Sequence, residues 1–125
     1  MFRKVYRKAY ELIVGRVDRV KFAQKIGVNF PRGVHLYGKI SWGSEPWIIT
    51  LGNNVNITDG VRFITHDGGT LLYRSRIPDF EITKPIVVGN NVYIGNNVLV
   101  LPGVTIESNV VIGAGAVVTR NIPNN

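Results

Sequence analysis

The sequence predicts an all-β fold, a parallel β-helix of short strands, and a repeat of six residues carries that prediction. From residue 88 to 123 the repeat runs without a slip. The first position of every hexad is aliphatic and the fifth is small or aliphatic. First positions are Val88, Ile94, Val100, Ile106, Ile112 and Val118, and fifth positions are Val92, Val98, Val104, Val110, Ala116 and Ile122. An α-helix repeats near 3.6 residues and a strand at 2, whereas a period of six is typical of a solenoid.

The spacing also predicts the shape of one turn of the solenoid. Positions one and five share parity, so on a short extended run their side chains point to one face. Between them lie Asn90, Asn96, Pro102, Ser108 and Ala114, which are mostly turn formers. Glycine and asparagine adopt left-handed backbone angles at low cost and suit corners. Three such sides close a triangular coil of 18 residues, while the spacing alone leaves the handedness open.

Earlier segments keep the same phase with two interruptions. Residues 51–56 (LGNNVN) and 57–62 (ITDGVR) are clean hexads, and residues 30–41 fit more loosely. The period breaks between Ser41 and Leu51, and again from Thr65 to about Val87. Insertions in solenoids usually form loops on one face, so we expect an inserted loop at about residues 67–86.

Composition indicates one small domain of 125 residues without cysteine, so neither a disulfide framework nor a thiol nucleophile is expected. The start lacks the apolar core of a signal peptide. Residues 85–106 carry no charge, but four asparagines and Pro102 argue against a membrane span. We therefore expect a cytoplasmic protein, with the inner membrane surface as the alternative location.

The net charge of +7 is concentrated at the N-terminus. Residues 1–25 hold eight lysines and arginines against two acidic residues, and the remainder is nearly neutral. Helical spacing of apolar residues predicts that residues 1–25 form a basic amphipathic arm, followed by a β-helix domain over residues 26–125. Such an arm packs on the open end of the solenoid or rests on an anionic membrane. Nucleic acid is disfavoured because no binding motif accompanies the charge.

Four stretches carry a resemblance to a known family: residues 44–61, 63–70 (FITHDGGT), 87–106 and 112–123. They resemble the bacterial hexapeptide-repeat acyltransferases, which are left-handed β-helices, and in particular the maltose- and galactoside-type O-acetyltransferases and their capsular polysaccharide relatives. The resemblance implies a homotrimer with active sites between subunits, acetyl-CoA as donor, and a sugar, sugar nucleotide or glycan as acceptor. O-acetylation of the acceptor is the main expectation; N-acetylation of a nucleotide amino sugar and a non-catalytic trimeric scaffold are the alternatives.

His66 is the expected catalytic residue. Acetyl transfer to a hydroxyl needs a base, and an imidazole, which titrates near neutral pH, suits that role. His66 lies where the repeat stops and is followed by Gly68 and Gly69, and the resemblance places the family's general base here. His35 has no comparable setting and is expected at the surface.

The candidate acceptor-binding residues are Ser44, Glu45, Trp47 and Asp67, and the resemblance implies an acidic position at Glu45 or Ser44. Spacing does not decide between Glu45 and Ser44 for the family's acidic position. Asp67 is adjacent to His66, and because neighbours on an extended chain point apart, it is a poor partner for the imidazole. Tryptophans flank Glu45 at positions 42 and 47, where sugar stacking and packing in the core or at an interface both stay open.

The resemblance implies donor-binding residues along the later coils. Tyr93 occupies an aromatic position near the pantetheine arm, and Asn96 and Ala114 are small corner residues that contact CoA. Thr119 and Arg120 match a hydroxyl and cation pair near the nucleotide, where a cation suits phosphate. No metal site is expected, since a zinc β-helix enzyme needs three histidines and the chain has two. The family pattern continues past residue 125 with a coil that helps to cover the nucleotide.

Overall fold

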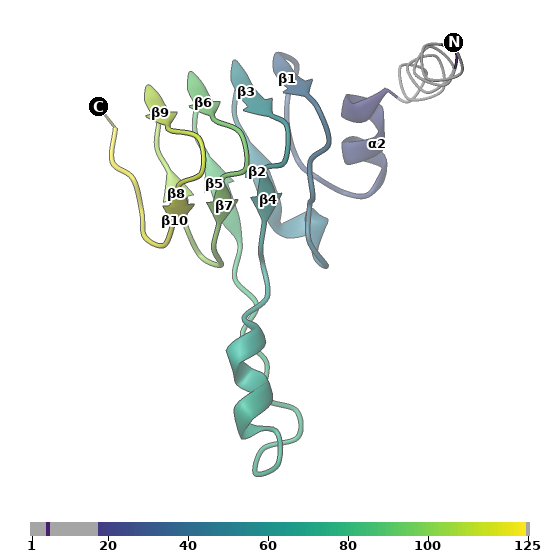
Figure 1. Ribbon diagram of the computed structural model, residues 1–125, viewed down its shortest axis with the longest axis vertical. Helices are drawn as coiled ribbons and strands as arrows, with labels where there is room; N and C mark the ends of the chain where they lie inside the picture. Colours follow the sequence, from purple (N-terminus) through teal and green to yellow (C-terminus); the bar gives the residue numbers. More distant parts are fainter. Residues whose placement is uncertain (1–4, 6–17, 125) are drawn as a thin grey trace.

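The computed structural model describes Val5 and residues 18–124, which wind into a solenoid of short strands with one long loop (Figure 1). In chain order the elements are helix α2 (Arg19–Lys25), β1 (Val34–Tyr37), the 3-10 turn η1 (Pro46–Ile48), β2 (Ile49–Leu51), β3 (Val55–Thr58), β4 (Arg62–Phe63), the 3-10 helix η2 (Gly68–Tyr73), β5 (Ile86–Val88), β6 (Val92–Ile94), β7 (Leu99–Val100), β8 (Thr105–Ile106), β9 (Val110–Ile112) and β10 (Val117–Val118).

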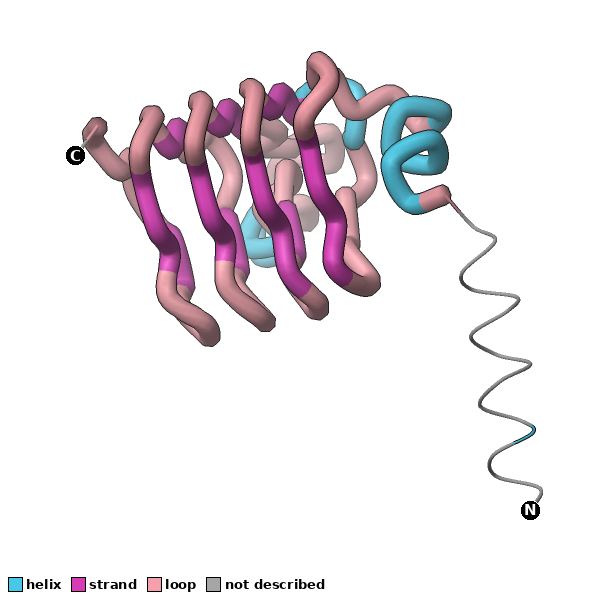
Figure 2. The backbone as a smooth tube through the Cα atoms, turned by 90° about the horizontal axis from the view of Figure 1, so that it is seen from above, coloured by secondary structure: helices cyan, strands magenta, loops and turns pink. Residues whose placement is uncertain are grey.

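The strands form three parallel sheets, one for each side of the coil. The first sheet has the order β1-β3-β6-β9, the second β4-β7-β10 and the third β2-β5-β8. In the later coils Val88 pairs with Ile106 and Val92 with Val110, so each residue meets the one 18 positions further along. The predicted triangular coil of 18 residues is confirmed. Figure 2 shows the strands of the first sheet side by side along the axis.

The interior contains the side chains that the hexad pattern predicts. All six first positions from Val88 to Val118 are buried, and so are four of the fifth positions, from Val92 to Val110. The last two fifth positions, Ala116 and Ile122, are half-buried and pack against this core. Because strand neighbours alternate in direction, residues such as Tyr93 and Val111 point outward between buried ones. Burial of each aliphatic side chain stabilises the coil by roughly 1.5–3 kcal/mol.

Seven corners of the coil turn on one residue with a left-handed backbone, and in each of these hexads it is the fourth residue. These residues are Asn54, Gly60, Asn91, Asn97, Gly103, Asn109 and Gly115, with φ between 54° and 80°. Glycine and asparagine serve these corners as expected, but the left-handed residue directly follows the third-position residues, such as Asn90 and Asn96, that the sequence singled out. This conformation costs asparagine less free energy than it costs other residues with a Cβ, because the short side-chain amide forms hydrogen bonds with nearby backbone.

A ladder of asparagine amides joins successive coils at the corner between the third and first sheets. The Nδ2 of Asn54 donates to Oδ1 of Asn91 over 2.5 Å, and Asn91 donates in the same way to Asn109 over 3.2 Å. Asn109 continues the ladder to Asn124. These bonds lie at the surface, so they fix the register of exposed corners that the apolar core does not reach.

Helix α2 packs beside the first coil (Figure 2). The carboxylate of Asp18 accepts hydrogen bonds from the amides of Val20 and Lys21, which caps the helix, and Ala23 is fully buried. The prediction for residues 1–4 and 6–17 of the basic arm lies outside the described residues. Among the helices of the described part, none is long and apolar enough to cross a membrane.

The long loop leaves the coil after β4 and returns before β5. It protrudes as a narrow arm in Figure 1 and contains η2. The coil continues on either side as though uninterrupted, since Phe63 still pairs with Val100 in the second sheet. The earlier interruption, between Ser41 and Leu51, holds only the short turn η1. Both interruptions lie where the chain passes from the second sheet to the third, and we call this edge the loop corner.

Candidate active site

The loop corner gathers a cluster of three polar side chains, Glu45, Thr65 and His66. Glu45 stands directly before η1 but makes no capping hydrogen bond to it. Its Oε2 instead accepts a hydrogen bond from Thr65 Oγ1 over 2.5 Å, and its Oε1 lies 4.0 Å from His66 Nδ1. Since Glu45 and His66 come from successive coils, the solenoid register itself brings the carboxylate to the imidazole.

The base of the loop fixes the backbone of His66. Asp67 donates its amide to the carbonyl of Ile82, and Lys84 donates its amide to the carbonyl of Thr65. His66 and Thr83 therefore face each other in a non-hydrogen-bonded antiparallel pair, where side chains lie close together. The hydroxyl of Thr83 accordingly lies 3.4 Å from His66 Nδ1.

Both contacts to the imidazole fall on the same nitrogen. Nδ1 faces the carboxylate of Glu45 and the hydroxyl of Thr83, and within residues 18–124 no partner is recorded at Nε2. The His66 side chain is 30% exposed and that of Glu45 21%, while Thr65 is buried. A carboxylate beside Nδ1 favours the tautomer with the proton on that nitrogen, in which the lone pair on Nε2 is free to accept a proton from a bound molecule.

Asp67 has a different role from its neighbour. Its carboxylate accepts the amide of Gly69 over 2.8 Å, which caps η2, and its carbonyl accepts the hydroxyl of Thr70. It also lines a cavity of about 530 Å³ within the loop, with Tyr73 and other mainly apolar residues. Asp67 therefore anchors the loop beside the cluster, and its recorded side-chain hydrogen bond goes to η2 and not to His66.

The two tryptophans separate into a core residue and a surface residue. Trp42 is buried and stacks on Phe63, with ring centroids 5.1 Å apart and planes nearly parallel at 1°. Trp47 is 59% exposed, and its carbonyl accepts a hydrogen bond from Asn29. The packing interpretation thus holds for Trp42, and Trp47 offers an exposed ring near the loop corner. Ser44 is exposed beside Glu45 and makes no side-chain hydrogen bond within the described range.

The predicted donor-binding residues lie at two separate places on the coil. Asn96 and Ala114 share the corner between the first and second sheets, where Gly115 donates its amide to the carbonyl of Asn96 over 2.7 Å. Gly95 is needed beside them because a Cβ there would lie 2.6 Å from the amide nitrogen of Ala114. Tyr93 points outward from the first sheet, 45% exposed.

Thr119 and Arg120 follow β10 at the loop corner, where both are exposed. The second sheet separates this pair from Asn96 and Ala114. One copy of the chain therefore does not bring the whole predicted donor set to one surface. Across residues 18–124 no group of three or more histidine, aspartate or glutamate side chains is arranged to hold a metal ion.

Two residues beside His66 were not predicted from the sequence: Thr65, which belongs to the cluster, and Thr83, which contacts the imidazole. Thr65 continues the inward alternation of Val61 and Phe63, and this parity could have marked it as a buried hydroxyl beside His66. Thr83 lies in the interrupted segment, where the hexad pattern gives no register, so no sequence signal pointed to it.

Comparison with known proteins agrees with the repeat and the coil. Residues 85–120 match the family model for the bacterial transferase hexapeptide, six repeats. Protein CapG of Staphylococcus aureus is 53% identical over 85 residues, which cover 68% of this chain and 49% of that protein. Galactoside O-acetyltransferase of Escherichia coli is 41% identical over 81 residues, covering 65% of this chain and 39% of that protein. The chain thus spans about half the length, or less, of these relatives.

A solved structure supports the same conclusion for the fold. The maltose O-acetyltransferase of Clostridium difficile 630 superposes with a TM-score of 0.63 at 27% identity, covering 86% of this chain and 67% of that one. The hexapeptide repeat and this neighbour fit a left-handed parallel β-helix. The repeat, the coil and these similarities together show that the chain belongs to the bacterial hexapeptide-repeat transferase family.

Proposed function

We propose that the chain carries the active site of an acetyltransferase that moves an acetyl group from acetyl-CoA to a hydroxyl of a sugar or glycan, with His66 as the general base. The observation that carries the proposal is the setting of the imidazole. Nδ1 of His66 lies 4.0 Å from Oε1 of Glu45 and 3.4 Å from Oγ1 of Thr83, and the side chain is 30% exposed at the corner from which the long loop emerges. The names of the galactoside and maltose O-acetyltransferases support acetyl transfer to a sugar.

In the proposed reaction His66 transfers one proton from the sugar hydroxyl to the leaving thiolate. Nε2 of His66 accepts the hydroxyl proton as the sugar oxygen bonds to the thioester carbon. The carbon–sulfur bond then breaks, the acetyl ester forms, and the leaving thiolate takes the proton from the imidazolium. Glu45 stabilises that transient imidazolium through Nδ1 and fixes the tautomer in which Nε2 is the base. Glu45 therefore acts as a positioning residue as well as a candidate contact for the acceptor.

The donor is placed along the later coils in this proposal. Small corner residues at Asn96 and Ala114 leave backbone groups within reach of the amide-rich pantetheine arm, and Arg120 suits a phosphate. Because the second sheet separates the two parts of the donor set, a second copy is proposed to complete the site, as in a homotrimer with sites between subunits. Light scattering that shows a strict monomer at micromolar concentration would contradict this assembly. The cytoplasm, or the inner membrane face through residues 1–25, is the proposed location.

Release of CoA from acetyl-CoA, measured with a thiol reagent, tests the function directly. The full chain is assayed with neutral hexosides, uronides and nucleotide amino sugars, and products are identified by mass and by their lability to base. Acceptor-dependent release with a base-labile ester supports O-acetylation, whereas a base-stable amide indicates N-acetylation. A trimer that releases no CoA with any acceptor would be a non-catalytic scaffold and would refute the proposal.

A further inference from the structure

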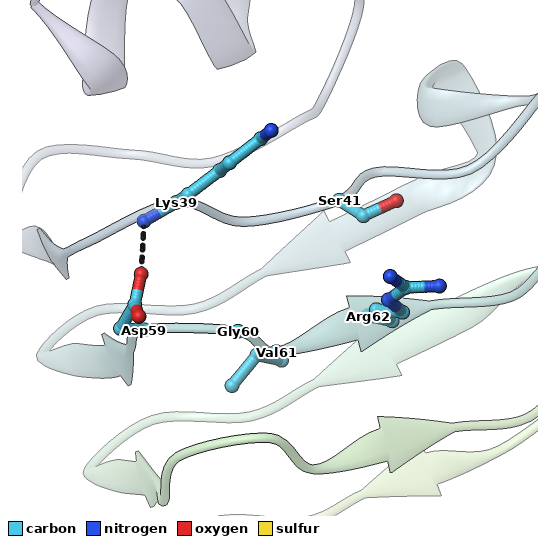
Figure 3. A pocket seen from close by; sticks show the side chains of 6 residues that line it. All are labelled: Lys39, Ser41, Asp59, Gly60, Val61 and Arg62. Carbon is cyan, nitrogen blue, oxygen red and sulfur yellow. Dashed lines mark hydrogen bonds between the residues drawn. The ribbon is translucent and has the colours of Figure 1, made fainter.

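A small pocket lies on the outer face of the second sheet, on the two coils that come first in the chain. It has a volume of about 200 Å³ and is lined by Lys39, Ser41, Asp59, Gly60, Val61 and Arg62. Ser41 and Arg62 form a parallel bridge on neighbouring coils. In Figure 3 the Ser41 hydroxyl and the Arg62 guanidinium project in the same direction, and the Lys39 side chain extends away from Asp59.

The pocket carries a net positive charge, and neighbouring acidic side chains do not neutralise it. Its single acidic residue, Asp59, accepts the backbone amide of Lys39 over 2.7 Å and forms no ion pair with either cation. In the part of the chain that the structure describes, Lys39 and Arg62 make no salt bridge, while another arginine, Arg74, pairs with Glu81. Two cations against one anion, with a hydroxyl donor between them, suit a carboxylate or a phosphate.

The pocket and the candidate base share one face of the chain. Val61, Phe63 and Thr65 point inward and are buried, so the alternate residues Arg62, Ile64 and His66 point outward. Four residues of extended backbone separate the Cα atoms of Arg62 and His66 by at most about 13 Å. One acceptor of two or three sugar units could therefore reach both a charged contact at Arg62 and the imidazole of His66.

We propose that this pocket binds an anionic group of the acceptor, so that the preferred substrate carries a negative charge beyond the ring that is acetylated. This inference rests on the proposed function of His66. The anionic group is a carboxylate of a neighbouring uronate or a phosphate of a nucleotide-linked sugar. The pocket lies on the two earliest coils, whereas the proposed donor residues Tyr93 to Arg120 lie on the later ones, which assigns the charge to the acceptor.

The test compares acceptors that differ only in charge. Wild type, Arg62→Gln, Lys39→Gln and a matched control, Lys21→Gln on the exposed side of α2, are assayed with a neutral disaccharide, the corresponding uronate disaccharide and a nucleotide-linked sugar. Circular dichroism confirms the fold of each variant. We expect Arg62→Gln to lower kcat/KM for the anionic acceptors by roughly tenfold or more. Its values for the neutral acceptor and for acetyl-CoA should change by less than about twofold, and Lys21→Gln should behave like wild type.

The preferred anionic acceptor identifies the source of the charge, and three results would overturn the inference. One is no loss with the anionic acceptors. Another is an equal loss with the neutral and anionic acceptors. The third is a loss confined to the KM of acetyl-CoA, which would assign the pocket to the donor phosphates.

A binding measurement separates this inference from the proposed function. If no acceptor is turned over, the pocket can still be tested by binding alone. The full chain is titrated with inorganic pyrophosphate and with galacturonate in the absence of acetyl-CoA, and binding is measured by calorimetry. Binding that weakens in Arg62→Gln and falls with added salt supports the pocket, since exposed charges are screened. Binding that is absent, or that is unchanged in Arg62→Gln, refutes it. Turnover of neutral acceptors without any role for Arg62 would leave the proposed function standing and this inference refuted.

Discussion

Replacing Glu45 with Gln removes the negative charge beside His66 and keeps the shape of the side chain. The amide oxygen of glutamine still accepts a hydrogen bond from Thr65, so the local packing should survive. What is lost is the attraction between the carboxylate and the imidazolium that forms when His66 accepts a proton. We therefore expect kcat to fall while the thermal stability stays close to that of wild type.

The size of the effect follows from the distance and the exposure. Two unit charges 4 Å apart attract by about 1 kcal/mol in water and about 4 kcal/mol at an effective dielectric constant near 20. Nδ1 of His66 and Oε1 of Glu45 are 4.0 Å apart, and the two side chains are 30% and 21% exposed. Solvent reaches both groups, which favours the lower part of that range, about 1–2 kcal/mol. The expected loss in kcat is then about five- to thirtyfold.

Initial rates of CoA release at saturating acetyl-CoA and sugar give kcat and KM separately. Glu81→Gln is the matched control, because Glu81 pairs with Arg74 at 3.4 Å within the loop and has no contact with His66. Thr65→Val provides a second test, since it removes the hydroxyl that donates to Glu45. If Thr65 acts by holding the carboxylate, Thr65→Val should have a smaller effect in the Glu45→Gln background than in wild type.

Two outcomes would refute the reasoning. A kcat equal to that of wild type in Glu45→Gln would show that the carboxylate does not assist the imidazole. A rise in KM for the sugar with kcat unchanged would assign Glu45 to acceptor binding alone, because uniform binding affects KM and not the chemical step.

Three further predictions concern the coil and the donor. Phe63→Ala should destabilise the fold by about 3–5 kcal/mol in urea unfolding, since the buried ring stacks on Trp42; the same loss for the exposed Tyr37→Ala would contradict this. Asn91 has φ of 54°; Asn91→Ala should therefore cost at least about 1 kcal/mol more than Asn91→Gly, because both lose the ladder but only alanine pays for the left-handed backbone. Arg120→Ala should weaken acetyl-CoA by roughly tenfold and spare acetyl-pantetheine; equal loss with both donors would exclude a phosphate contact.

The periodic part of this chain was predictable because each residue of a hexad has one environment. The first and fifth positions fill the coil, so inward and outward faces could be assigned from Val88 to Val118 without further information. The structure was needed to show that the left-handed backbone falls at the fourth position. Local conformation and burial agree at every level here, which is why the sequence pattern sufficed.

The cluster around His66 could be predicted only in part. His66 was marked by the point where the repeat ends, but its partners depend on which coils lie next to each other and on how the loop returns. Glu45 reaches it across coils, and Thr83 reaches it across the base of a 16-residue excursion between the paired positions 66 and 83. Neither contact is encoded in a local period, so the structure was needed to show that both fall on Nδ1.

The central claim, that His66 is the general base, is tested most directly by the kcat of His66→Ala for acceptor-dependent CoA release. His35→Ala is the matched control, since His35 is exposed on β1, outside the loop corner. We predict that kcat falls by at least about 100-fold in His66→Ala. The KM for acetyl-CoA should stay near that of wild type, and His35→Ala should be fully active. A His66→Ala variant that turns over at the wild-type rate would contradict the account.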